Sequence, residues 1–170
     1  MDRIFIGLGS NLGDRMRYLH QALSEIANTK KIFMKKYSSV YETEPVGYKE
    51  QQMFLNMAAE LESTLAPQDL LGNLKEIEKN LGRSNSEHWG PREIDLDILY
   101  YGSEVINSDK LRLPHPEIAN RKFVLVPMEE IAAEFIDPVQ NLNIKNLLKC
   151  CLDTSAVIKI SLPINLQEKV

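Results

Sequence analysis

Cysteine is almost absent from this chain. The 170 residues include only Cys150 and Cys151, which are neighbours in sequence. Adjacent cysteines cannot join distant segments, and they do not form the CxxC pair that metal and redox sites use. We therefore expect both thiols to be reduced and to have only a structural role.

Long apolar runs and an excess of positive charge are missing as well. The opening residues, MDRIFIGLGSN, lack the features of a signal peptide, and no apolar run approaches the roughly 18 residues of a membrane span. The net charge is -4, with both signs mixed along the chain, which argues against a protein that coats nucleic acid or a membrane. The sequence thus predicts a cytoplasmic protein with no nucleic-acid, membrane or obligate protein partner.

The common nucleotide-binding glycine motifs are also missing. The glycines of GLGSNLG are spaced one residue too widely for the dinucleotide fingerprint, and no acidic residue ends a second strand where a ribose would need it. The chain contains no GxxxxGK[ST] motif either. We therefore reject a dinucleotide-binding enzyme, and ATP could bind only without a P-loop.

Apolar spacing predicts an alternation of strands and helices. Period-two alternation indicates strands over 3–8, 32–40 and 55–61, and helical spacing indicates helices over 16–26 and 67–81. A strand that contains Asp95 and Asp97 completes the order βαββαβ. This order predicts an α+β fold, a ferredoxin-like sandwich with its helices on one face of the sheet.

The rest of the chain is predicted to add α/β elements to this core. Residues 113–121 are expected to form a Pro-rich loop, 123–131 a strand that runs into a short helix, and 144–152 a further helix. No repeat or linker is present, and the length suits one domain over 1–170.

Residues 90–102, GPREIDLDILYYG, place two acids in an apolar strand. Side chains two apart share a face of a strand, so Asp95 and Asp97 would stand side by side. Adjacent carboxylates repel unless a cation or a proton lies between them, and oxygen ligands suit Mg²⁺. A metal site is the favoured interpretation, and a solvated strand face that tolerates both acids is the alternative.

Cationic loop residues could face phosphates bound at this strand. Arg92 directly follows Gly90 and Pro91, so its guanidinium could reach such phosphates. His115 lies between two prolines, and we favour a phosphate or base contact for it over zinc. No histidine is expected in the metal site. The other cations on predicted loops, each of which could instead be solvated, are Arg83, Lys110, Arg112, Arg121 and Lys122.

Phe54 and Asn56 share one face of the strand over 55–61. An aromatic ring beside a group that donates and accepts hydrogen bonds could bind a flat heterocycle. Equally, Phe54 could belong to the core and Asn56 to a solvated edge. Glu78 flanks the apolar stripe of the second helix, where an acid is usually solvated.

Together these motifs resemble a known enzyme family. GPREIDLDIL is preceded by LGR at 81–83 and followed by LPHPEIANRKFVLVPMEEIA at 113–132, while GSNLGDR, YETEPVG and FLNMA occur earlier in the same order. Over nearly its whole length the chain resembles the 6-hydroxymethyl-7,8-dihydropterin pyrophosphokinases of folate biosynthesis. The resemblance implies a ferredoxin-like fold and transfer of the terminal diphosphate of ATP to the pterin hydroxymethyl group, giving AMP.

The resemblance also implies roles for matched residues. Asp95 and Asp97 would hold two Mg²⁺ ions that bridge the ATP phosphates, and Arg83 and Arg92 would stabilise charge on the transferred group. The implied nucleotide contacts are Glu78, Trp89, Ile98, Lys110, Arg112, His115 and Arg121. The implied pterin contacts are the stacking rings of Phe54 and Phe123, the polar side chain of Asn56, and the backbone of residues 43–46, which include Thr43, Pro45 and Val46.

The chain departs from the expected family pattern at a few positions. Asn85, His88 and Lys110 stand where arginine is common, and Phe54 and Pro116 stand where tyrosine is common. A lysine cannot reproduce a bidentate arginine clamp, so ATP binding could be weaker. Because the acid pair and both principal arginines are present, we expect an active enzyme.

Two other functions fit the residues without the resemblance. A palm-like nucleotidyl transferase also places paired carboxylates around two metals, but it would release pyrophosphate instead of AMP. A non-catalytic ligand-sensing module could share the fold, but it would have no need for the acid pair. Substitution of the two aspartates separates the second alternative from an enzyme.

Overall fold

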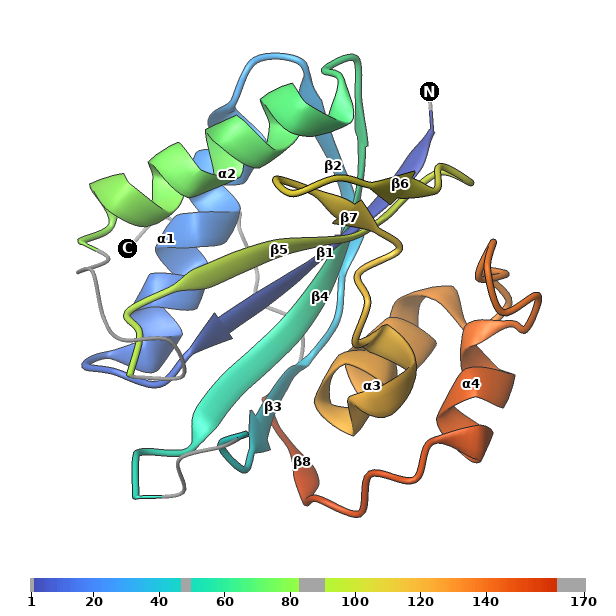
Figure 1. The fold of residues 1–170 in the computed structure, drawn as a ribbon. Coiled ribbons are helices and arrows are strands. Elements are labelled where there is room, and N and C mark those ends of the chain that lie inside the picture. Colours follow the sequence, from blue (N-terminus) through green and yellow to red (C-terminus); the bar gives the residue numbers. More distant parts are fainter. Residues whose placement is uncertain (1, 47–49, 83–90, 162–170) are drawn as a thin grey trace.

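An antiparallel sheet runs through the middle of the computed structural model, which describes residues 2–46, 50–82 and 91–161 (Figure 1). Its strands are hydrogen-bonded in the order β5-β1-β4-β3-β8, and β2 also pairs with β4. The strands are β1 (Arg3–Ser10), β2 (Ile32–Tyr37), β3 (Val40–Thr43), β4 (Phe54–Ser63), β5 (Asp95–Tyr101) and β8 (Val157–Ser161). A second, two-stranded sheet pairs β6 (Ile106–Asn107) with β7 (Arg112–Leu113).

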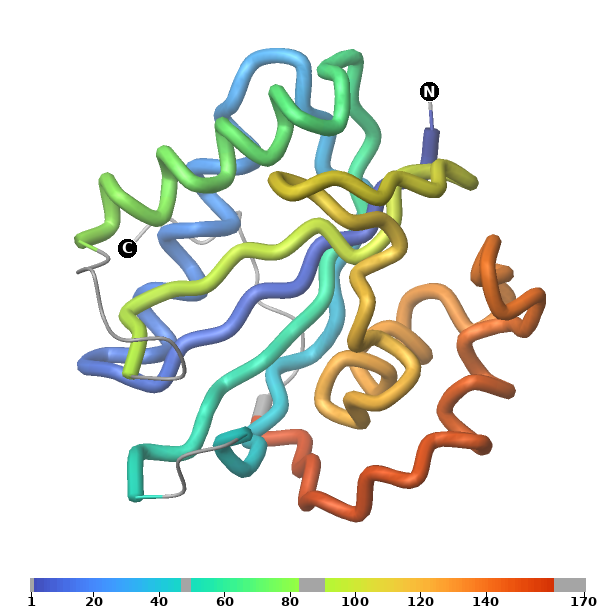
Figure 2. Tube along the Cα trace, viewed as in Figure 1, coloured from blue at the N-terminus to red at the C-terminus, as the bar shows by residue number. Residues whose placement is uncertain are grey.

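Helices cover both faces of the large sheet (Figures 1 and 2). On one face lie α1 (Arg15–Asn28) and α2 (Pro67–Asn80), and on the other lie α3 (Lys122–Ala132) and α4 (Ile144–Cys150). The two helices of the predicted βαββαβ core, α1 and α2, lie on one face as expected, and the helices added after β5 cover the other face. Among the described residues, no helix combines the length and apolarity needed to cross a lipid bilayer.

Strand β1 is buried on both of its faces. Ile4, Ile6 and Leu8 pack into the core beneath α1 and α2, whereas Phe5 belongs to the core beneath α3 and α4. Alternate side chains of a strand point to opposite faces, so one short strand supports two cores. The starts of β4 and β5, which carry Asn56 and Asp95, pair with this buried strand.

The second predicted strand, over 32–40, is divided into β2 and β3. The division occurs at Ser38, whose backbone N–H donates to the Ala58 carbonyl at 2.8 Å. The Ser38 hydroxyl oxygen in turn accepts from the Ala58 N–H at 3.0 Å. The Ser38 hydroxyl thus replaces a backbone carbonyl as the acceptor of one interstrand hydrogen bond, and the strand is interrupted here. The alternation of apolar residues does not reveal this interruption.

The segment over 123–131 forms a helix throughout, so the predicted strand there was wrong. Phe123 and two valines raise the strand propensity of this segment. In the structure Leu125, Met128 and Ile131 are buried at helical spacing and pack into the core beneath α3 and α4. Pro127 lies inside the helix, where it removes one backbone donor. Burial of this apolar face has overridden the local propensities.

Candidate active site

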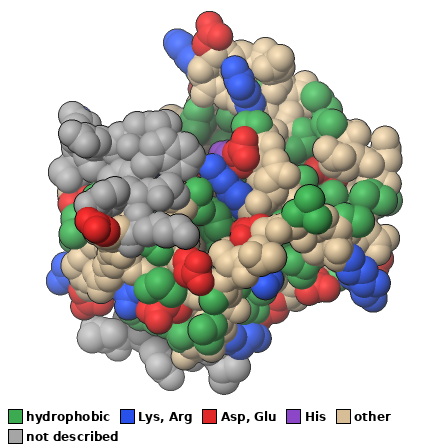
Figure 3. All heavy atoms as spheres, turned by 60° about the horizontal axis from the view of Figure 1, so that its bottom comes forward, with side chains coloured by type: hydrophobic (Ala, Val, Ile, Leu, Met, Phe, Trp, Pro, Cys, Tyr) green, Lys and Arg blue, Asp and Glu red, His purple; other side chains and the backbone are tan. Residues whose placement is uncertain are grey.

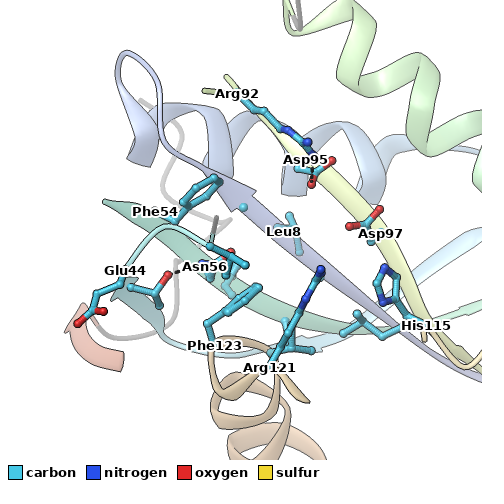
Figure 4. Close-up of a pocket in the computed structure, with 18 residues that line it drawn as sticks. Leu8, Glu44, Phe54, Asn56, Arg92, Asp95, Asp97, His115, Arg121 and Phe123 are labelled. Atoms are coloured by element: carbon cyan, nitrogen blue, oxygen red, sulfur yellow. Dashed lines mark hydrogen bonds and ion pairs between the residues drawn. The ribbon is translucent and has the colours of Figure 1, made fainter. Parts of the chain in front are cut away.

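A cleft of about 270 Å³ opens where the middle of β1, the start of β4 and the start of β5 meet the first turn of α3. Figure 3 shows a hollow in which acidic, basic and histidine side chains meet apolar ones. The cleft brings together many of the residues chosen from the sequence: Thr43, Val46, Phe54, Asn56, Arg92, Asp95, Asp97, His115, Arg121 and Phe123 (Figure 4).

Two glycines of β1 form the floor of this cleft. Gly9 pairs with Asn56 on one side and Asp95 on the other, and Gly7 pairs with Asp97 and Ala58. A Cβ atom added at Gly9 would lie 2.7 Å from Asn56 Oδ1. Any side chain here would intrude on the cleft, so glycine keeps its centre open. These glycines belong to GLGSNLG, but they lie inside a strand and not in a phosphate-binding turn.

Asp95 and Asp97 both line the cleft, which confirms the predicted shared face of β5. The Asp95 and Asp97 side chains are 22% and 40% exposed. Asp95 Oδ2 pairs with Arg92 Nη1 at 2.8 Å, and Asp97 Oδ1 lies 3.5 Å from Lys75 Nζ. Two carboxylates with solvent access fit Mg²⁺, which takes one or two protein carboxylates and keeps water or phosphate as its other ligands. The described residues contain no larger cluster of acids, histidines or cysteines suited to a metal.

Glu78 lies behind the two aspartates and is only 2% exposed, contrary to the expected solvated position. Its Oε1 accepts from the Leu96 N–H at 2.6 Å and from Lys75 Nζ at 2.8 Å. Lys75 also donates to the Leu96 carbonyl at 2.8 Å. These bonds join α2 to the residue between the aspartates. Sequence reasoning missed Lys75, although its i,i+3 spacing to Glu78 was a possible signal.

Asn11 holds the segment before β5, and sequence reasoning missed this role too. Its side-chain Oδ1 accepts from the Arg92 N–H at 2.7 Å, and its backbone N–H donates to the Arg92 carbonyl at 3.0 Å. The amide Nδ2 donates to Gln51 Oε1 at 3.0 Å. Asn11 is almost fully buried, so these bonds fix the backbone from which the Arg92 guanidinium reaches Asp95. Its position in the GSNLGDR motif was the available signal.

His115 lies beside Asp97 in the cleft (Figure 4). Its backbone N–H donates to the Leu99 carbonyl of β5 at 2.9 Å, which ties the loop to the strand. Burial lowers the pKa of His115 and outweighs the opposing charge of Asp97, so the neutral imidazole is favoured. A loop distant in sequence thus brings His115 into the cleft that Asp95 and Asp97 line, although these three residues do not form a metal-binding cluster.

The other end of the cleft suits a flat, polar ring. Phe54 from β4 and Phe123 from α3 lie on either side of Asn56 (Figure 4). Asn56 Nδ2 donates to Thr43 Oγ1 at 2.7 Å, which orients the amide and leaves its Oδ1 next to Gly9. The Arg121 guanidinium carbon lies 5.8 Å from the centre of the Phe123 ring. Aromatic surfaces thus lie beside an oriented amide.

Comparison with known proteins decides which family shares this arrangement. The family model for 7,8-dihydro-6-hydroxymethylpterin-pyrophosphokinase (HPPK) matches residues 5–133. The chain belongs to this family. The Bacillus subtilis 2-amino-4-hydroxy-6-hydroxymethyldihydropteridine pyrophosphokinase is 46% identical over 130 residues, which cover 76% of this chain and 78% of that protein. The enzyme of the same name from Aquifex aeolicus is 40% identical over 159 residues, which cover 89% and 98%.

A solved pyrophosphokinase structure has the same fold. The Plasmodium falciparum HPPK-DHPS, crystallised with pterin and p-hydroxybenzoate, superposes with a TM-score of 0.69 at 16% identity. The likeness covers 88% of this chain and 41% of that one, so this HPPK chain spans less than half of the Plasmodium protein. At this identity the likeness shows the fold alone, and it supports an α+β arrangement of sheet and helices.

Some residues expected to bind ligands do not line the cleft of this HPPK chain. Ile98 is buried in the core beneath α1 and α2, Lys110 and Arg112 are exposed at the β6–β7 hairpin, and Pro45 lies outside the lining. Arg83, Asn85, His88 and Trp89 fall outside the described residues. The cleft adds lining residues that sequence reasoning did not select: Gly7, Leu8, Gly9, Met57, Ala58, Leu99 and Val124.

Proposed function

We propose that this chain carries out the reaction of its family in the cleft above Gly7 and Gly9. The chain is a pyrophosphokinase of folate biosynthesis, which transfers pyrophosphate from ATP to hydroxymethyldihydropterin. Family membership decides against the nucleotidyl transferase and the ligand sensor. The observation that carries the placement is that Asp95 and Asn56 flank the same glycine, so a phosphate site and a heterocycle site adjoin.

In this proposal Asp95 and Asp97 hold two Mg²⁺ ions together with the ATP phosphates. Bound Mg²⁺ would neutralise phosphate charge and orient the transferred group. Arg92 and Lys75 balance the charge of the two carboxylates in the structure. Because Arg92 Nη1 lies 2.8 Å from Asp95 Oδ2, its guanidinium would be in reach of phosphates held at the two aspartates.

The remaining cations would hold the nucleotide and the transferred group. Arg121 and His115 line the cleft beside the aspartates, in reach of a substrate that fills it. We propose the same role for Arg83, on the strength of the family pattern. Such groups accelerate pyrophosphate transfer by stabilising charge, because this chemistry needs little covalent help from the protein. Trp89, Lys110, Arg112 and the backbone at Ile98 would complete the nucleotide contacts, and Glu78 would support them from behind β5.

The pterin is proposed to stack between Phe54 and Phe123 with its polar edge at Asn56. The Thr43 hydrogen bond fixes the amide orientation, so Asn56 Oδ1 can accept from a ring N–H. Val46 lines the same end of the cleft, and Pro45 precedes it. For transfer to occur, the hydroxymethyl group must face the aspartates across Gly9.

We further infer that β1 to β5 form a ferredoxin-like core within a single domain over 1–170. If β2 and β3 count as one interrupted strand, the sheet order is fourth, first, third and second strand, all antiparallel. This is the order that two interleaved split βαβ units produce. One sheet shared by both cores supports a single domain.

The Asp95→Asn and Asp97→Asn variants test the proposed metal site. We expect either change to lower kcat on the order of 1,000-fold, because stabilisation of the transferred phosphates is lost. Binding of Mn²⁺, followed by electron paramagnetic resonance, should weaken in both variants. The pterin dissociation constant should stay within twofold. Asp69→Asn, at an exposed acid in the first turn of α2, is the matched control. Wild-type turnover in either cleft variant would disprove the placement.

A further inference from the structure

The segment 153–157, which follows α4 and ends at the first residue of β8, contacts both sides of the proposed pterin site. It begins at Asp153, beside the first turn of α3, and ends at Val157, which pairs with Thr43 of β3. Figure 1 shows this connection passing from α4 to the edge of the sheet next to β3. The segment lies outside residues 5–133, which the family model matches.

Asp153 replaces the missing cap of α3. Arg121, at the N-cap position, makes no side-chain capping bond. Instead, Asp153 Oδ2 accepts from the backbone N–H of Lys122, the first residue of α3, at 2.9 Å. The Lys122 ammonium also donates to the Ser155 carbonyl at 3.4 Å. A residue 31 positions later thus satisfies a donor that helices leave open at this end.

The carboxylate of Asp153 is itself held in a fixed orientation. Its Oδ1 accepts from the Ser155 N–H at 2.9 Å and from the Ser155 hydroxyl at 2.6 Å. Burial alone would raise the pKa of Asp153, but the bonds from Ser155 and Lys122 lower it below the ordinary value. The group is therefore charged at neutral pH, which suits the positive end of α3.

The same segment contacts the opposite side of the cleft. The Ala156 N–H donates to Glu44 Oε1 at 3.3 Å, and Glu44 lines the cleft. Thr43, which pairs with Val157, accepts the bond that orients Asn56. The first turn of α3 and the end of β3 are thus joined through five consecutive residues.

We propose that Asp153 is a positioning residue for the reduced pterin. By fixing Lys122, it sets the distance and angle between Phe123 on α3 and Asn56 on β4, and it touches no substrate itself. The inference rests on the proposed function, because it takes the pterin to lie between Phe54 and Phe123. A site that contacts a flat ring on both faces depends on the distance between the elements that carry these contacts.

Pterin binding to Asp153→Ala, followed by the fluorescence of the pterin, tests the proposal. Loss of a cap usually weakens a helix end enough for about a fivefold rise in the pterin dissociation constant. Binding of a non-hydrolysable ATP analogue should stay within twofold. Asp153→Asn should recover most of the pterin affinity, because the amide oxygen can still accept from Lys122. Ser155→Ala keeps the carboxylate but loosens it, so a smaller change in the same direction is expected.

Asp14→Ala is the matched control, since Asp14 caps α1 by accepting from the Arg17 N–H at 3.1 Å on the far face of the sheet. This variant should lose stability but keep pterin affinity. The proposal is overturned if Asp153→Ala binds pterin like the wild type, or if it weakens pterin and nucleotide equally. Asn56→Ala separates a failure of the proposed pterin site from a failure of the inference about Asp153. Undiminished pterin binding in Asn56→Ala overturns the site and the inference together, whereas a defect in Asn56→Ala but not in Asp153→Ala overturns only the inference.

Discussion

At the scale of single residues, the space above Gly9 sets what the cleft can hold. Gly9 lies between Asn56 and Asp95 on adjacent strands, so it separates the proposed pterin and phosphate sites. Asn56 cannot easily move away, because it is buried and bonded to Thr43 at 2.7 Å. In the proposed site, binding of both substrates would therefore require the space at Gly9.

We predict that Gly9→Ala lowers kcat/KM for the pterin by on the order of 10- to 100-fold. The new Cβ would lie 2.7 Å from Asn56 Oδ1, so the amide must turn and lose its orientation. Steady-state kinetics with varied pterin measures the effect. Gly72→Ala on α2 is the control, since nothing lies within 4 Å of its Cβ position and its kinetics should not change. Unchanged kinetics in Gly9→Ala would show that the pterin does not depend on Asn56.

The sequence predicts some of these residues and not others for a physical reason. The shared face of Asp95 and Asp97 follows from strand geometry, which is local. Lys75 contacts Leu96 of β5, and Asn11 contacts Arg92 just before β5. These contacts join residues far apart in the chain, and residue type alone does not reveal them. Glu78 was expected in solvent because its burial depends on how α2 packs on β5.

At the scale of elements, Glu78 links α2 to the strand that carries both aspartates. We predict that Glu78→Ala lowers the free energy of unfolding by about 2–4 kcal/mol, because the Leu96 N–H and Lys75 lose a buried acceptor. Glu78→Gln should cost less, since its amide oxygen can still accept from Leu96. Urea unfolding measures both. Exposed Glu76 on the same helix gives the control, Glu76→Ala. Equal losses in the two alanine variants would mean that this link contributes nothing.

Helix α3 was not predicted correctly from its local sequence. Helices α1 and α2 were predicted well, because apolar residues recur every three or four positions along them and form one buried stripe. The α3 segment is apolar on more than one side and contains Pro127, so its periodicity does not separate helix from strand. Its helical form follows from packing beneath the sheet and from the distant Asp153 cap.

At the scale of the whole molecule, charged and phenolic groups define a pH range of stability. Burial favours the neutral carboxyls, but bonds from partners lower the pKa of Glu60, Glu130 and Asp153 below their ordinary values. Their stabilisation is present above the unfolded-state pKa values and is lost as pH falls through the lower folded ones. Burial raises the pKa of Tyr41, Tyr100 and Tyr101, so their stabilisation is lost as pH rises above 10.0.

We predict a plateau in the free energy of unfolding between about pH 7 and pH 9, with losses on both sides. The loss on the acid side begins as pH falls below 6.5, because the unfolded state then binds a proton at His115 more readily than the folded state does. Urea unfolding across this range measures the plateau. Glu60→Gln should make the free energy of unfolding fall less steeply at acid pH. The variant lacks the Arg3 Nε–Glu60 Oε1 ion pair of 2.6 Å, so protonation cannot remove it. Tyr100→Phe, which removes the hydroxyl that donates to Asp137, should flatten the alkaline side instead. An acid side as steep in Glu60→Gln as in the wild type would contradict the assignment.

Diphosphate transfer is distinguished from other ATP-dependent reactions by the nucleotide that it releases, which is AMP. Purified protein is incubated with ATP and Mg²⁺, with and without 6-hydroxymethyl-7,8-dihydropterin, and AMP and ADP are separated by chromatography. We predict AMP in equal amount to pterin diphosphate, and only when pterin is present. Formation of ADP, or AMP release that does not depend on pterin, would contradict diphosphate transfer to the pterin.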